Sequence, residues 1–158
     1  MKEDALKTLV AQGLAAMKSG GKVAATATDE IRNDARHPDL KAALEQGNQT
    51  SQEWMQRIDQ ALQEAGGGGE QRNPVLESLY EVSRQIRPQA PDDASRDLGI
   101  IANGQLALHY WIAAFGTIRT YSERVGLSGA AKAMQTSLEE ARAADEQYNE
   151  ITKTILAG

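Results

Sequence analysis

Apolar residues recur along most of the chain at alternating spacings of three and four, which is the period of an amphipathic helix. The first stripe extends from Val10 to Ala35 and stays in phase across Gly20-Gly21. Each glycine weakens a helix by roughly 1 kcal/mol relative to alanine. Two alternatives are therefore open: one helix over about residues 3–35, or two helices broken at 19–21. We favour the single long helix because the stripe continues in phase.

A second helix begins at Pro38, because proline is favoured at the first helical position and His37-Pro38-Asp39 is typical of a turn. Its stripe leads to the consecutive glycines 66–69, which form a flexible connector. The inward positions are Leu40, Leu44, Gly47, Ser51, Trp54, Met55, Ile58 and Leu62.

Three more helices follow. A short one opens at Asn73-Pro74, Asp92 or Asp93 caps the next, and Ser128 caps the last. The expected apolar face of the short helix is Val75, Leu79, Val82 and Ile86. The expected inward stripes of the two long helices are Leu98, Ile101, Gln105, Leu108, Ile112 and Phe115, and then Ala131, Met134, Leu138, Ala141, Asp145, Tyr148, Thr152 and Ile155.

The lengths of the connections predict the topology. Very short links make residues 3–65 and residues 92–157 two antiparallel hairpins, and the crossover over residues 66–91 is long enough to run along a bundle. Two hairpins joined by one long crossover are the ferritin-like arrangement. We therefore predict an all-α, ferritin-like four-helix bundle, with a short extra helix in the crossover and one domain over residues 1–158.

Composition excludes several classes of function. The 17 basic and 22 acidic residues give a net charge of −5, which argues against nucleic acid or an anionic membrane as a partner. The absence of cysteine excludes disulfides, thiolate metal sites and a cysteine nucleophile. No apolar run approaches the roughly 20 residues of a membrane span, and the N-terminus lacks the apolar core of a signal peptide.

The middle of the predicted bundle has an unusual composition. Each residue rises about 1.5 Å along a helix, so counting from the tight turns estimates which positions share a level. Leu108 and Asp145 lie at equal depth in one hairpin, and Gly21 and Ser51 do so in the other. Ferritin-like proteins fill this region with a cage of Glu and His around two metal ions. This chain places Gly, Ser, Leu, Ala and one Asp there.

Several segments resemble the YciE/YciF-type ferritin-like family. Residues 109–117 (HYWIAAFGT) are similar to its third helix, residues 138–146 (LEEARAADE) to its fourth, and residues 38–44 (PDLKAAL) to the start of its second. The resemblance covers most of the chain and is weakest in the first helix and the crossover. It implies a bacterial, cytoplasmic, stress-related protein that forms a homodimer.

The resemblance also implies the acidic and histidine ligands of a dinuclear metal site, and most of these positions are substituted here. Of the carboxylates of the fourth helix, Asp145 and Glu140 remain. The substituted positions are Gly21, residues 47–51, Leu108, Trp111 and Ala141.

A di-iron or di-manganese site of this type takes a Glu from each of two helices and a Glu-x-x-His pair from each of the other two. The sequence contains no Glu-x-x-His, and one inward Asp with a nearby His109 cannot coordinate two divalent cations. We therefore expect no metal, no other cofactor and no catalytic residue. A metal-binding oxidoreductase is the third hypothesis, and its reduced site would use His109, Glu140 and Asp145.

The preferred hypothesis is a non-catalytic bundle that acts by binding or association. It includes a homodimer, and the apolar residues Leu76, Leu79, Leu127 and Leu156 are expected either to cover one another or to form the partner surface. Each of the central residues also has a purely structural explanation: a buried hydrogen bond for Asp145, core packing for the tryptophans, and close helix approach for the glycines.

The second hypothesis is a small-molecule site in the vacated centre, with Asp145 and His109 as polar anchors. A void above about 150 Å³ with convergent polar groups favours it, and tight packing of Trp111 across the centre argues against it. The candidate pocket residues are Gly21, Ser51, Trp54, Gln105, Leu108, His109, Trp111 and Asp145.

Overall fold

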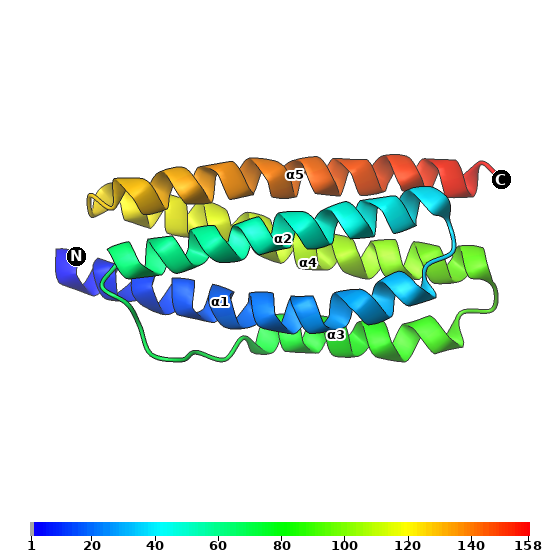
Figure 1. Ribbon diagram of the computed structural model, residues 1–158, viewed down its shortest axis with the longest axis horizontal. Coiled ribbons are helices and arrows are strands. Elements are labelled where there is room, and N and C mark those ends of the chain that lie inside the picture. Colours follow the sequence, from blue (N-terminus) through cyan, green and yellow to red (C-terminus); the bar gives the residue numbers. More distant parts are fainter. Residues whose placement is uncertain (1) are drawn as a thin grey trace.

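The computed structural model describes residues 2–158, and within them all regular structure is helical. Four long helices lie side by side, and a shorter one lies along the outside of the bundle (Figure 1). The elements are α1 (Glu3–Asp34), α2 (Pro38–Glu64), α3 (Pro74–Ile86), the 3-10 helix η1 (Arg87–Gln89), α4 (Asp93–Arg124) and α5 (Ser128–Leu156).

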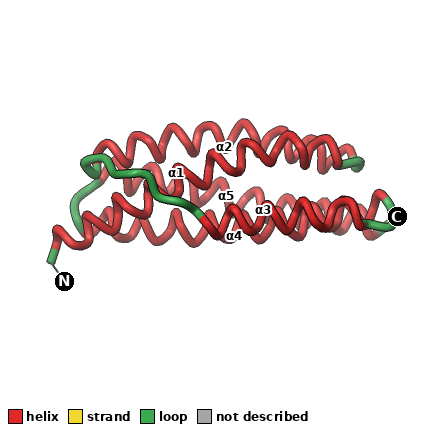
Figure 2. The backbone as a smooth tube through the Cα atoms, turned by 90° about the horizontal axis from the view of Figure 1, so that it is seen from below, coloured by secondary structure: helices red, strands yellow, loops and turns green. Residues whose placement is uncertain are grey.

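The predicted fold class is confirmed. Helices α1 and α2 form one antiparallel hairpin and α4 and α5 form the other, with their turns at opposite ends of the bundle (Figure 1). The crossover passes along the outside of α1 before it enters α3 (Figure 2), and Gly68 lies against Ala11 and Ala15. Around the bundle, α1 contacts α2 and α4, while α5 contacts α2 and α4; α3 covers the side formed by α1 and α4.

Helix α1 is continuous through Gly20-Gly21, as favoured above. A Cβ at Gly20 would lie 2.5 Å from Cδ1 of Leu76 and 2.6 Å from Nδ2 of Asn73, both of which come from the region of α3. A Cβ at Gly21 would lie 1.8 Å from Sδ of Met55 in α2. The two glycines therefore allow neighbouring helices to approach α1 closely.

Local signals fix most helix ends. Pro38 is the first residue of α2, and Asp92 caps α4 by accepting a hydrogen bond from the Ser95 N–H at 2.7 Å. Ser128 does not cap α5, contrary to the prediction. The carboxylate of Glu64, at the end of α2, accepts from Ala130 N–H at 2.6 Å and also from the preceding N–H. A negative charge at a helix N-terminus is favourable, so a distant residue replaces the local cap.

The inward stripe was predicted correctly for α1 and shifted for α4. In α4 the expected residues Gln105, Leu108 and Ile112 are only half-buried, whereas Ala107 and Trp111 are buried. The reason is that the exposed face of α4 also carries apolar residues, among them Ala102, Leu106 and Ala113, so apolar periodicity does not mark its buried side.

The predicted face of α3 is wrong. Val75, Val82 and Ile86 are 55%, 45% and 37% exposed, while Leu76 and Ser83 are buried. The inward face of α3 carries polar groups that periodicity does not count as core. Of the residues expected in a partner surface, Leu76 is fully buried, Leu79 and Leu127 are half-buried and Leu156 is 69% exposed.

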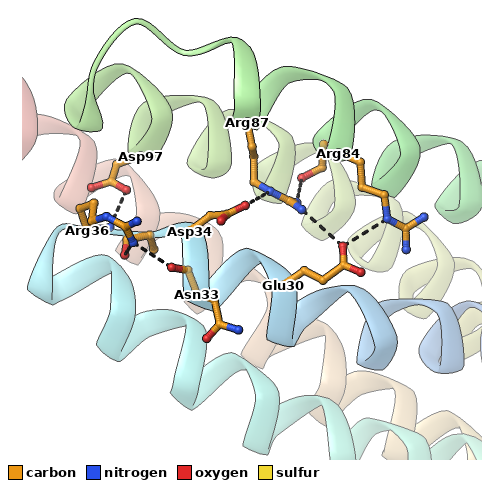
Figure 3. Close-up of polar contacts among 9 residues, drawn as sticks. Glu30, Asn33, Asp34, Arg36, Arg84, Arg87 and Asp97 are labelled. Atoms are coloured by element: carbon orange, nitrogen blue, oxygen red, sulfur yellow. Dashed lines mark hydrogen bonds and ion pairs between the residues drawn. The ribbon is translucent and has the colours of Figure 1, made fainter.

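A polar network replaces apolar packing where α3 meets the α1–α2 turn (Figure 3). The buried Arg87 donates to Asp34 at 2.8 Å and to Oγ of Ser83 at 2.7 Å. The buried Asp97 of α4 accepts the backbone N–H groups of Arg36 and His37 at 2.9 and 2.7 Å. These contacts tie the α1–α2 turn to the second hairpin and satisfy groups that would be costly to bury alone.

Helix α4 is, by length and composition alone, apolar enough to cross a membrane. The sequence analysis underestimated its apolar character. Core helices of soluble proteins pass the same test, and α4 packs against α1, α3 and α5 here.

We predict that Gly20→Ala destabilises the protein although alanine is the better helix former. The new Cβ would displace the fully buried Leu76 and the Asn73 cap of α3, and such overpacking costs about 1–3 kcal/mol. The matched control is Gly47→Ala in α2, where a Cβ meets no atom within 4 Å. That variant is expected to gain up to about 1 kcal/mol. Urea unfolding measures both, and an equal gain in the two variants would contradict the close approach at Gly20.

Candidate functional site

The core of the bundle is divided into two clusters with a pocket between them. One cluster includes Trp54 and Trp111, and the other includes Ile31, Leu44 and Ile100, and all of these line the pocket. The pocket has a volume of about 110 Å³. It receives residues from α1, α2, α3, α4 and α5, and it therefore lies inside the bundle rather than on one face.

Three polar side chains in the pocket wall lack partners. Asn103 of α4 donates through Nδ2 to the carbonyl of Leu79 at 3.0 Å, while its buried Oδ1 has no hydrogen-bond partner. Burial raises the pKa of Tyr148 to about 12. Burial, together with the charge of Tyr148, also raises the pKa of Tyr80 to about 12. Both phenols are therefore neutral at pH 7.

The structure brings five of the eight candidate pocket residues together. These five residues line the pocket with backbone, a hydroxyl group and apolar side chains, and they are Gly21, Ser51, Trp54, Leu108 and Trp111. Gln105, His109 and Asp145 do not line the pocket. The expectation that His109 and Asp145 anchor a central ligand is therefore wrong in this structure. It followed from the shifted stripe of α4, because one residue rotates a helix position by about 100°.

The three remaining candidates form a separate cluster between α4 and α5. Nε2 of His109 lies 3.1 Å from Oδ2 of Asp145, and Nε2 of Gln105 donates to Oδ1 of Asp145 at 3.2 Å. The His109 side chain is 64% exposed and the Asp145 side chain 18% exposed. Asp145 thus makes side-chain hydrogen bonds, which was the structural explanation given for it in place of a ligand contact. The cluster faces solvent.

Glu140, the other surviving carboxylate of the fourth helix, is held by α2. Arg57 donates to its two oxygens at 2.6 and 3.1 Å, and Nε1 of Trp54 donates to Oε2 at 2.8 Å. Burial raises the pKa of Glu140, but these hydrogen bonds and the charge of Arg57 outweigh burial and lower it below 4.5. A guanidinium therefore already balances this carboxylate.

The donors present do not fit a dinuclear metal centre. Across residues 2–158, no group of three or more His, Cys, Asp and Glu side chains is placed to hold a metal ion. This result also contradicts the reduced site of His109, Glu140 and Asp145. Glu140 is engaged by Arg57, whereas Asp145 is engaged by His109 and Gln105.

Aromatic rings fill the core beside the pocket. The centroid of Trp54 lies 5.7 Å from that of Trp111 and 5.1 Å from that of Phe115, and Trp111 stacks on Phe115 at 5.3 Å. The tryptophans therefore serve as core residues and as pocket wall at once. The pocket volume of about 110 Å³ is below the about 150 Å³ set as the criterion for a ligand cavity, whereas the convergent polar groups meet the second part of that criterion.

Sequence reasoning missed Tyr80, Ser83 and Asn103 in the pocket wall, and Arg57 as the partner of Glu140. A signal for α3 existed: Leu76, Tyr80, Ser83 and Arg87 recur at spacings of four, three and four. Counting only apolar residues selected the positions one residue earlier, which are rotated by about 100° around this helix.

Comparison with known proteins supports the resemblance noted from the sequence. The model of the family described as "Domain of unknown function (DUF892)" matches residues 5–157. Protein YciF of Escherichia coli (strain K12) is 28% identical over 132 residues, which are 82% of this chain and 75% of that protein.

Two solved structures share the fold. The crystal structure of the E. coli stress protein YciF superimposes with a TM-score of 0.91 at 23% identity, covering 96% of this chain and 97% of that one. The structure of YcfI from Rhodopseudomonas palustris gives a TM-score of 0.86 at 24% identity, covering 91% and 92%. At these identities the structural likeness concerns the fold alone.

We predict a pH dependence that Glu140 controls. Its pKa is lowered by folding, so its contribution to stability is present above the unfolded value near 4.5 and is lost as the pH falls through the lower folded value. Glu140→Gln should lose about 1–3 kcal/mol at pH 7. It should also show a shallower fall of unfolding free energy below pH 4.5 than the wild type.

Glu139→Gln, which removes the exposed neighbouring carboxylate, is the matched control. Urea unfolding from pH 7 to pH 3 measures the three proteins. Identical pH profiles for the two variants would show that the Arg57–Glu140 pair does not control this dependence.

Proposed function

This chain belongs to the DUF892 family. We propose that it is a metal-free, non-catalytic ferritin-like bundle that acts by binding or association in a bacterial stress response. The stress role rests on the relative from E. coli, which carries the name of a stress protein. A cytoplasmic location belongs to the same proposal.

The observation that carries the proposal is the donor set of the bundle centre. Gly21, Ser51 and Leu108 occupy positions where the family resemblance implies metal ligands, and all three line an uncharged pocket. Two metal ions bring a large positive charge that needs several carboxylates to balance it. The two carboxylates that remain, Glu140 and Asp145, are bound by other side chains.

A second candidate function is small-molecule binding in the pocket. It is supported by the unpartnered Asn103 Oδ1 and the two free phenols, which converge on one apolar space. Ligand sites in proteins combine mostly apolar walls with a few polar groups of this kind.

Association with a second copy of the chain is the other binding mode that we propose. Its support is the outward face of α3, where Val75, Val82 and Ile86 are exposed at helical spacing. These residues replace the buried Leu76 as the centre of the proposed partner surface. Exposed apolar residues grouped on one helix are typical of protein–protein contacts.

We predict less than about one tenth of an equivalent of bound metal in protein purified without chelator, also after incubation with Fe(II), Mn(II) and Zn(II), because three ligands do not converge in the described chain. Elemental analysis measures this directly. One to two equivalents, lost in Asp145→Ala, would overturn the metal-free proposal and return redox chemistry to first place.

We predict that Val82→Glu weakens self-association by about tenfold or more, because burying an unpaired carboxylate in an interface is costly. Light scattering after size-exclusion chromatography, over a range of protein concentrations, measures the mass. Gln60→Glu adds the same charge to an exposed position of α2 and serves as the control. A wild-type chain that stays monomeric at all concentrations, or a Val82→Glu dimer of unchanged affinity, would contradict this surface.

A further inference from the structure

We propose that the pocket binds a small uncharged molecule of about one aromatic ring that carries an O–H or N–H donor, and that the ligand reaches it from the groove between α2 and α5. The ligand class rests on the second candidate function and defines it chemically.

The pocket excludes charged ligands. Its wall is made by backbone and by apolar, hydroxyl and amide side chains, and no Asp, Glu, His, Lys or Arg is among the described residues that line it. An ion moved from water into such a site loses its hydration and finds no opposite charge. Carboxylates, phosphates, ammonium groups and metal cations are therefore disfavoured, and a neutral molecule is not.

The polar groups of the wall define what a neutral ligand must offer. Oδ1 of Asn103 is an acceptor without a donor, since Nδ2 of the same amide is already bound to Leu79. A buried acceptor left unpaired costs free energy that a ligand O–H or N–H would recover. The hydroxyl groups of Tyr80 and Tyr148 provide a donor for the oxygen or nitrogen of the same ligand.

The apolar wall and the volume set the size and shape. Trp54 and Trp111 provide ring faces, while Ile31 and Leu44 provide branched side chains. The space of about 110 Å³ is somewhat smaller than a cavity of about 150 Å³ that holds benzene. A single ring is therefore the upper limit for the ligand, and a larger ring system does not fit.

The opening lies at Gly47. A groove of about 380 Å³ between α2 and α5 shares Gly47, Leu108 and Tyr148 with the pocket. Gly47 is exposed, and a Cβ there would meet no atom within 4 Å, so open space adjoins this glycine where the groove and the pocket meet. It stands inside a long helix, where glycine is unfavourable by about 1 kcal/mol relative to alanine. An open passage gives a reason for glycine at this position.

The test uses phenol as the probe, with benzene as the analogue without a donor and benzoate as the charged analogue. Trp54 and Trp111 are the two tryptophans of the chain, and both line the pocket, so tryptophan emission reports occupancy directly. We expect a saturable change with phenol, an affinity for benzene about 3- to 10-fold weaker because one hydrogen bond is missing, and no saturable change with benzoate.

Two variants locate the site. Asn103→Leu should abolish the preference for phenol over benzene, so that the two affinities become about equal, because the acceptor is gone. Gly47→Leu should weaken both probes at least tenfold by closing the passage, and its added side chain also favours the helix. Gln56→Leu, on the exposed side of α2, is the matched control and should bind as the wild type does. Circular dichroism melting confirms that each variant is folded.

Three results would overturn the ligand assignment: no saturable change with phenol up to its solubility limit, equal responses to phenol and benzoate, or unchanged phenol binding in folded Gly47→Leu. The metal content decides the proposed function independently. If the protein binds metal and also binds phenol at this pocket, the ligand assignment is supported and the metal-free function is contradicted. If the protein binds neither metal nor any of the three probes, the metal-free function is supported and the ligand assignment is contradicted.

Discussion

The constraint on which the structure depends is that charge cannot remain unbalanced inside a bundle of four long helices. A ferritin-like centre satisfies this constraint when carboxylates and metal ions balance each other. Here the pocket at the middle of the bundle is lined by glycine, serine and leucine among others, and no Asp, Glu, His, Lys or Arg is among its described residues. The described wall of this pocket therefore carries no charged side chain that would need a counter-charge.

The carboxylates that survive have partners outside this centre. Glu140 faces α2, where Arg57 supplies the positive charge and the Trp54 indole supplies a further donor. Asp145 lies at the α4–α5 boundary with His109 and Gln105. Glu140 thus links Arg57 to a tryptophan that also belongs to the aromatic core. Any function that needs two inward carboxylates is incompatible with this arrangement.

Two groups of buried side chains lie around the centre of the bundle. Trp54, Trp111 and Phe115 belong to one, and Ile31, Leu44 and Ile100 belong to the other. Between them lies a pocket whose wall includes the small residues Gly47 and Gly104. Close packing is the rule in protein interiors, and an open space with unpaired polar groups is therefore a feature that needs a cause.

The sequence by itself determined the helices, the two hairpins, the crossover and the inward face of α1, because these follow from local signals: period, proline, glycine and the length of each link. The resemblance of the C-terminal half gave the family, and the substitutions at the ligand positions followed from it. Five of the eight candidate residues line the pocket on this basis. Apolar periodicity works where a helix has one buried side.

Only the tertiary structure decided which faces of α3 and α4 point inward. The exposed face of α4 carries apolar residues such as Leu106, so its apolar stripe is ambiguous, and His109 lies on the solvent side of the predicted boundary. The inward face of α3 carries Ser83 and is followed by the buried Arg87, whose charge is tolerated because Asp34 and Glu30 of α1 bind it. Glu64 likewise replaces the cap expected from Ser128. The partners of Arg87 in α1 and the partner of Glu64 at the start of α5 are more than 50 residues away along the chain, and a local pattern carries no information about such a partner.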